Sequence, residues 1–354
     1  KLFNFIKSPI LLDRNDVLES TIKLDLEHEN YDLTTSLEMY ETLSGSNSDR
    51  YQYVLPSYDF SKNFNLDNLN GSFNFNSTGN NTLRETNISA SILSNNLNYS
   101  SYDSFFTNGV KSNFEVTFKN INTVGKNNTQ YKNSPQSEIM SSYNYNLSLP
   151  LAKKNENSIN TLMPKISFRL SPHEMKNNSN TGRRINIDNI FNNNRLSLID
   201  SFEGGESVTL GIDFAKEKIN VKNNITEIQE YFDIKFATVL RLNEEKNIPT
   251  NSTLNKKMSN IFGQLNFKTN EIFSLNYDFS LTDDLNTFEY NSINANFNFN
   301  DFSTQFTYLE ERGNIGNANV IENKIKYEIN DYNSILFGTR RNRSLNLTEY
   351  YDLV

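Results

Sequence analysis

The chain has 354 residues, with 42 Asp and Glu against 34 Lys and Arg, a formal net charge of −8 and no Cys. The absence of Cys excludes disulfides, thiol nucleophiles, iron–sulfur clusters and Cys-type zinc sites. Two isolated histidines, His28 and His173, form no imidazole cluster for a metal or a Ser/His catalytic pair. The acidic balance argues against a nucleic-acid-binding surface. We therefore predict a protein that is not an enzyme and uses no metal or cofactor.

The dominant pattern is alternation of apolar and polar residues with a period of two. In residues 273–281 the odd positions carry Phe, Leu or Tyr and the even positions carry Ser, Asn or Asp. This alternation predicts a strand with one apolar and one polar face. We count about 17 such segments of roughly 8–12 residues. In chain order the clearest are 22–26, 31–39, 73–75, 114–118, 143–149, 166–170, 208–214, 234–240, 273–281, 293–299, 302–308, 325–329 and 345–353.

Segments rich in Gly, Asn and Ser predict turns between these strands, because such residues tolerate positive φ. Helical periodicity never lasts more than about two turns. A polar stretch at about 173–203 is much longer than the other connections and predicts a long loop. The fold class that follows is all-β and antiparallel. The predicted turns are 44–47, 78–81, 125–128, 243–246 and 313–316, with a tight turn at 331–333.

The choice of antiparallel architecture depends on the polar face of the strands. A soluble sandwich uses short strands and buries one apolar face against another. Here the strands are long and their second face is strongly polar, as in Asn294, Asn296 and Asn298. An outer-membrane barrel places the apolar face in lipid and the polar face in a wet interior, and no run of 18 apolar residues predicts a transmembrane helix. Tyrosines near strand ends match an interfacial girdle, and they are Tyr31, Tyr99, Tyr102, Tyr143, Tyr308 and Tyr351.

Several segments resemble the LPS-assembly outer-membrane protein family LptD (organic solvent tolerance protein family). Residues 161–172 resemble a family strand that opens at Leu162-Met163-Pro164 and closes with Ser171-Pro172. Residues 183–195 and 202–212 resemble its mid-barrel loop and the strand that follows. Residues 49–56 and 347–353 resemble two further strands. The residues that carry the resemblance are Pro164, Ser171, Pro172, Asn189, Phe191, Asn194, Arg195, Glu203, Gly204 and Gly205.

The resemblance implies a barrel of about 26 strands in the Gram-negative outer membrane. It also implies insertion of lipopolysaccharide into the outer leaflet, a plug lipoprotein (LptE-like) inside the barrel, and a periplasmic bridge protein reached through a separate domain. The chain lacks that domain, the family's cysteines and a terminal aromatic strand. We therefore expect residues 1–354 to be a single barrel domain that is an incomplete fragment, and we assign no gate residue.

Particular residues allow both a functional and a structural interpretation. We expect Pro164 and Pro56 to begin strands, and Gly204-Gly205 to form a turn with positive φ. A divalent cation on acidic loop residues and lipid phosphates on paired arginines are weaker hypotheses, because exposed charges are usually only solvated. The acidic residues are Asp188, Asp200, Glu203 and Glu206, and the arginines are Arg183, Arg184, Arg340 and Arg341.

Two other functions remain open from the sequence. The barrel could be a porin or nutrient-uptake channel, which conductance in planar bilayers would reveal. The chain could instead be a secreted β-rich adhesin or solenoid that spans no membrane. A solenoid requires a fixed repeat length, whereas the spacing here varies. In either case the partners of the polar face are not nucleic acids.

Overall fold

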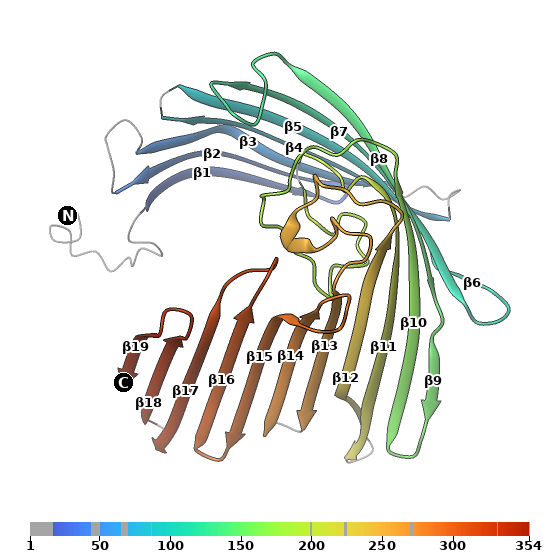
Figure 1. The fold of residues 1–354 in the computed structure, drawn as a ribbon, viewed down its shortest axis with the longest axis vertical. Coiled ribbons are helices and arrows are strands. Elements are labelled where there is room, and N and C mark those ends of the chain that lie inside the picture. The colour runs from blue at the N-terminus through green and yellow to red at the C-terminus, as the bar shows by residue number, and fades with distance from the viewer. Residues whose placement is uncertain are drawn as a thin grey trace. The chain divides into compact units, whose positions relative to one another are not determined.

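The computed structural model describes residues 17–43, 50–64, 70–85, 87–198, 200–222, 225–269, 272–330 and 332–353 (Figure 1). The chain divides into two compact units. The first lies within residues 1–100 and 117–140, and the second within residues 101–116 and 141–354. Within the described residues, no helix is long and apolar enough to cross a membrane.

The first unit is an antiparallel sheet whose strands follow one another in chain order. Strand β1 pairs with β2, β2 with β3 and β3 with β4. Its strands are β1 (Val17–His28), β2 (Tyr31–Thr42), β3 (Tyr51–Phe64), β4 (Gly71–Arg84) and β5 (Ile88–Ser101), with parts of β7 (Lys111–Lys126) and β8 (Gln136–Ser148).

The second unit continues with antiparallel neighbours from β10 to β19, which Figure 1 shows side by side. It contains β6 (Ser104–Phe105), parts of β7 and β8, β9 (Leu151–Lys154), β10 (Ser158–Ser171), β11 (Gly205–Lys222), β12 (Ile225–Arg241), β13 (Ile261–Thr269), β14 (Phe273–Leu281), β15 (Phe288–Phe299), β16 (Phe302–Glu311), β17 (Asn319–Asn330), β18 (Asn333–Asn342) and β19 (Leu347–Leu353). A 3-10 turn, Thr250–Ser252, lies in the connection between β12 and β13. The described part of the chain thus has 19 strands, and the all-β antiparallel prediction is confirmed.

The two faces of the second unit's sheet differ as the alternation predicts. On one face, which we call the apolar face, Phe168 is 44% exposed, Leu210 39% and Leu240 37%. On the other, which we call the loop-covered face, Thr209 and Val239 are buried. A soluble sandwich would bury the apolar rows against each other. The core of this unit lies instead beneath its loops, so the sandwich is excluded here.

The connections at the two ends of these strands have different lengths. At one end β9 and β10 are joined by residues 155–157, and β15 and β16 by residues 300–301. At the other end β10 and β11 are separated by residues 172–204, and β12 and β13 by residues 242–260. The predicted loop at about 173–203 corresponds to the first of these. Outer-membrane barrels have short periplasmic turns and longer outer loops.

Some predicted turns are correct and others are wrong. Residues 125–128 and 313–316 lie where β7 and β16 end. Residues 78–81 are not a turn, because they lie inside β4. The glycine there has a packing role, since a Cβ on Gly79 would meet the Tyr58 ring at 2.4 Å. Residues 243–246 lie between β12 and β13, as predicted, at the start of the long connection 242–260. The turn predicted at 44–47 lies outside the described residues.

The two prolines do not begin strands. Pro164 lies inside β10, where β8 pairs with residues 165–170 and β9 with residues 159–162. The missing proline N–H therefore falls where the neighbouring strand is interrupted, and the Leu149 N–H donates to the Pro164 carbonyl at 3.0 Å. Pro56 lies inside β3, at an irregularity in its register with β4. Prolines inside strands favour such irregular positions because they cannot donate to the ladder.

Candidate functional site

Loop 172–204 and loop 242–260 form one folded layer of the second unit. The Asn178 N–H donates to the Asn247 carbonyl at 2.8 Å, and the Thr250 N–H donates to the Ser179 carbonyl at 3.2 Å. The Asn247 side chain donates to the Met175 carbonyl at 3.2 Å. Figure 1 shows both loops on the same side of the strands. Backbone hydrogen bonds of this kind satisfy the polar groups that a packed loop would otherwise bury unpaired.

An apolar core joins this layer to the sheet. Ile190 and Leu196 of the first loop and Ile248 of the second are 0%, 2% and 0% exposed. They belong to one cluster with Val239 of β12 and Phe262 of β13. Both strand residues lie on the loop-covered face, as does Ala237, the register partner of Phe262. Burying apolar side chains here stabilises the folded layer by about 1.5–3 kcal/mol for each large side chain.

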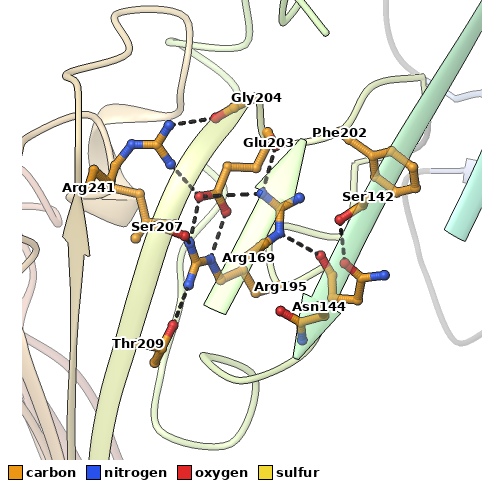
Figure 2. A network of polar contacts seen from close by, with 12 residues as sticks. Ser142, Asn144, Arg169, Arg195, Phe202, Glu203, Gly204, Ser207, Thr209 and Arg241 are labelled. Carbon is orange, nitrogen blue, oxygen red and sulfur yellow. Dashed lines mark hydrogen bonds and ion pairs between the residues drawn. The ribbon is translucent and has the colours of Figure 1, made fainter. Parts of the chain in front are cut away.

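The centre of the site is a buried cluster of one carboxylate and three guanidinium groups (Figure 2). Arg195 donates to both Glu203 carboxylate oxygens, with Nε at 2.7 Å from Oε2 and Nη2 at 2.5 Å from Oε1. Arg241 Nη1 donates to the same Oε1 at 2.5 Å. Arg169 Nη1 lies 3.9 Å from Oε1 and donates to the Glu203 backbone carbonyl at 2.8 Å. All four side chains are at most 3% exposed.

Further hydrogen bonds hold the guanidinium groups in place. Arg195 donates to the hydroxyls of Ser207 and Thr209, each at 3.0 Å. Arg241 Nη2 donates to the Gly204 carbonyl at 2.5 Å. These partners lie on β11 and at its start, so the cluster connects β10, β11 and β12 to the end of loop 172–204 (Figure 2). A buried charge is tolerated only when it is paired and hydrogen-bonded in this way.

The charges fix the protonation state of the carboxyl group. Burial alone would raise the pKa of Glu203, but the neighbouring charges of Arg195, Arg169 and Arg241 and the hydrogen bonds from Arg195 lower it to about 2. The group is therefore ionised at any ordinary pH. A carboxylate held by three cations has no proton to donate and is a poor base. The cluster is suited to positioning a loop rather than to acid–base chemistry.

The structure brings together several residues that carry the family resemblance. Arg195, Glu203 and Gly204 belong to the charged cluster. Gly205, the first residue of β11, adopts the positive φ expected there, 85°. Phe191 lies over β11, because a Cβ on Gly211 would meet its ring at 2.6 Å.

The other residues of that set lie within loop 172–204 or in β10, which precedes it. Asn194 Oδ1 accepts from the Leu198 N–H at 3.3 Å, and Asn189 Oδ1 accepts from the Asn186 N–H at 2.9 Å. Ser171 ends β10 and Pro172 follows it. Pro164 lies seven residues before Ser171 in the same strand, away from the cluster.

Sequence reasoning missed Arg169 and Arg241. Both stand at polar positions of alternating strands, beside Phe168 and Leu240. A charge on the face that a loop covers requires a partner, so the sequence could have predicted that each of these arginines has an acidic partner. The sequence does not identify that partner, because Glu203 lies 34 residues from Arg169 and 38 residues from Arg241 along the chain.

The two ligand hypotheses for charged residues are not supported by their placement. Glu203 faces arginines, and within the described residues no group of three or more His, Asp or Glu could hold a metal ion. Arg184 pairs with Glu311 across the loop. Arg340 pairs with Glu349 at 2.7 Å. Arg341 donates to Asn346 Oδ1 at 2.9 Å. Arg184, Arg340 and Arg341 are therefore engaged within the chain.

The fold and site define a class of protein. An antiparallel sheet with an exposed apolar face, and an opposite face covered by its own folded loops, is the wall of an outer-membrane β-barrel. The model of the family described as "LptD: LPS transport system D" matches residues 1–335, and the chain belongs to this family. A search of curated proteins gave no match.

Solved structures similar to this chain include an iron transporter and a ferric enterobactin receptor. The FrpB iron transporter of Neisseria meningitidis is 12% identical, with a TM-score of 0.35 over 94% of this chain and 61% of that one. The ferric enterobactin receptor PfeA of Pseudomonas aeruginosa is 8% identical, with a TM-score of 0.40 over 92% of this chain and 60% of that one. The chain thus spans about three fifths of these structures. At these values the likeness carries no argument about function.

Proposed function

We propose that this chain is part of the barrel wall through which lipopolysaccharide is inserted into the outer leaflet of the outer membrane. The observation that carries the proposal is the family match over residues 1–335, together with a sheet that has one exposed apolar face. The protein acts by geometry, and no bond is made or broken. The chain would therefore work without a cofactor.

The two faces of the sheet would have different roles. The apolar face, with Leu210 and Leu240 exposed, would meet hydrocarbon. The opposite face would enclose a wet lumen, in which loop 172–204 is fixed by the Glu203 cluster. A fixed loop layer keeps part of the lumen occupied by protein, so that a large amphipathic substrate is held against the wall rather than passing freely.

Partners follow from the same proposal. A plug lipoprotein (LptE-like) would occupy lumen space that the loops leave, and a periplasmic bridge protein would deliver the lipid through a domain outside these residues. The family match supports these partners as a class only.

The test is depletion of the full-length protein in its own cells. We expect lipopolysaccharide accessible to antibody on intact cells to fall, while the amount released on lysis stays the same. Outer-membrane fractionation and heat-modifiable gel migration should both be positive. Unchanged surface lipopolysaccharide, together with solute conductance in planar bilayers, would support a channel and refute the proposal.

A further inference from the structure

Three lysines gather at the short-turn end of β11–β13. Lys216, Lys218 and Lys268 line a pocket of about 340 Å³ together with Tyr231 and the turn residue Asn157. All three lysine side chains are exposed. Among the side chains that the structure describes, no carboxylate pairs with any of them. Within those described side chains, the pocket thus offers positive charge that no paired carboxylate compensates.

The pocket adjoins the apolar face. A register irregularity between Lys216 and Glu217 in the pairing of β11 with β12 leaves Tyr231 as the extra residue next to Phe232. The Tyr231 ring lies 5.2 Å from the Phe267 ring, and Lys216 Nζ lies 6.0 Å from the Tyr231 ring centroid. Phe232 and Phe267 are register partners. By alternation Phe232 shares a face with Leu240, which is exposed.

The aromatic rings continue along this end of the strands. The Phe214 and Phe232 rings are 6.1 Å apart, as are the Phe267 and Phe273 rings. Aromatic rings mark the level at which a barrel leaves hydrocarbon for the headgroups, and long lysine side chains reach from that level into water. Lys216 is the register partner of Phe232 and Lys218 lies two residues nearer the turn, so these two lysines lie at the level of the rings and beyond it, within reach of the headgroups.

The strand end at which the pocket lies indicates which leaflet of the membrane the pocket faces. Lys218 is the register partner of Ser158, which directly follows the short connection 155–157. Short turns face the periplasm in outer-membrane barrels. The charged pocket therefore faces the inner leaflet, which phospholipids form, and not the leaflet that receives lipopolysaccharide.

We propose that the pocket lined by Lys216, Lys218, Lys268 and Tyr231 binds the phosphate-bearing headgroup of an anionic phospholipid of the inner leaflet. The acyl chains of this lipid lie along the Phe214–Phe232–Phe267 rings. The bound lipid anchors the barrel at a defined depth. The proposal depends on the membrane-barrel fold and not on the transported substrate, so it stands or falls separately from the proposed function.

The experiment uses the full-length protein in nanodiscs of phosphatidylcholine containing a minor fraction of phosphatidylglycerol. Native mass spectrometry measures the phosphatidylglycerol retained on the released protein. The variant Lys216→Gln/Lys218→Gln is compared with Lys246→Gln/Lys257→Gln, which removes the same charge from exposed positions in loop 242–260. Heat-modifiable migration verifies that both variants are folded.

We expect retained phosphatidylglycerol to fall by about fivefold for each lysine removed at the pocket, or about 30-fold for the double variant. The loop variant should retain the wild-type amount, and Lys216→Arg/Lys218→Arg should restore binding. Equal losses in both glutamine variants, or retention of phosphatidylcholine as strong as that of phosphatidylglycerol, would overturn the proposal. So would displacement of the lipid by millimolar inorganic phosphate, because a free-ion site would then suffice.

Discussion

The charged cluster predicts the effect of Glu203→Gln on loop 172–204. The substitution keeps the size of the side chain but removes the carboxylate that Arg169, Arg195 and Arg241 share. The pKa of Glu203, about 2 against an ordinary 4.5, corresponds to about 3 kcal/mol of favourable interaction in the folded state. Removing one partner of a buried ion pair costs about 3–5 kcal/mol by a separate line of reasoning. The two magnitudes agree.

This free energy should appear as opening of the loop rather than as unfolding of the barrel, because the strand ladders do not pass through Glu203. A loss of about 3 kcal/mol raises the population of the open loop by about 100-fold. Trypsin cleavage after Arg195 measures it, since the Arg195 side chain is 1% exposed and is reached only when the loop opens. Cleavage after the exposed Arg183 serves as the internal reference.

The matched control is Glu206→Gln, three residues along the chain and exposed. It removes the same charge without touching the cluster and should leave cleavage after Arg195 at the wild-type rate. Heat-modifiable migration should be unchanged in both variants. If Glu203→Gln were cut after Arg195 no faster than the wild type, the cluster would not fix the loop and the reasoning would be refuted.

Three further predictions follow from the same geometry. The folded-state pKa of Glu203 lies below its unfolded value, so the stability that Glu203 gives to the loop is complete above about pH 4.5 and is lost as the pH falls towards 2. Pepsin cleavage within residues 172–204, normalised to cleavage of an unfolded peptide, should therefore rise as the pH falls across that window in the wild type. It should not rise in Glu203→Gln. Gly211→Val should displace the Phe191 ring, lower the stability of the closed loop by about 1–3 kcal/mol and increase trypsin cleavage after Arg195. Cleavage equal to that of the wild type would show that the contact between Phe191 and Gly211 is dispensable. Ile293→Arg, in the middle of the apolar face of β15, should lower the free energy of unfolding in vesicles by about 2–4 kcal/mol in a urea titration, whereas Asn294→Arg on the opposite face should lower it by less than about 1 kcal/mol. Equal losses would contradict the assignment of the faces.

Alternation was a dependable signal because it is local. A residue on a strand faces one side or the other according to its position alone, so Phe273–Leu281 could be read as a two-faced strand without any partner. Glycine and proline were less dependable. Gly79 looked like a turn residue and is in fact the position over which the Tyr58 ring packs, and Pro164 lies inside a strand because the adjacent strand is interrupted beside it.

Patterns within short segments were enough to predict the antiparallel fold class, the two-faced strands, the long loop and the family. Only the tertiary structure showed that Glu203 meets Arg169 and Arg241, since strand pairing brings together residues 34 and 38 positions apart. The same pairing placed three lysines and a tyrosine around one pocket at the short-turn end. Contacts between strands depend on register, and register depends on the whole sheet rather than on any one segment.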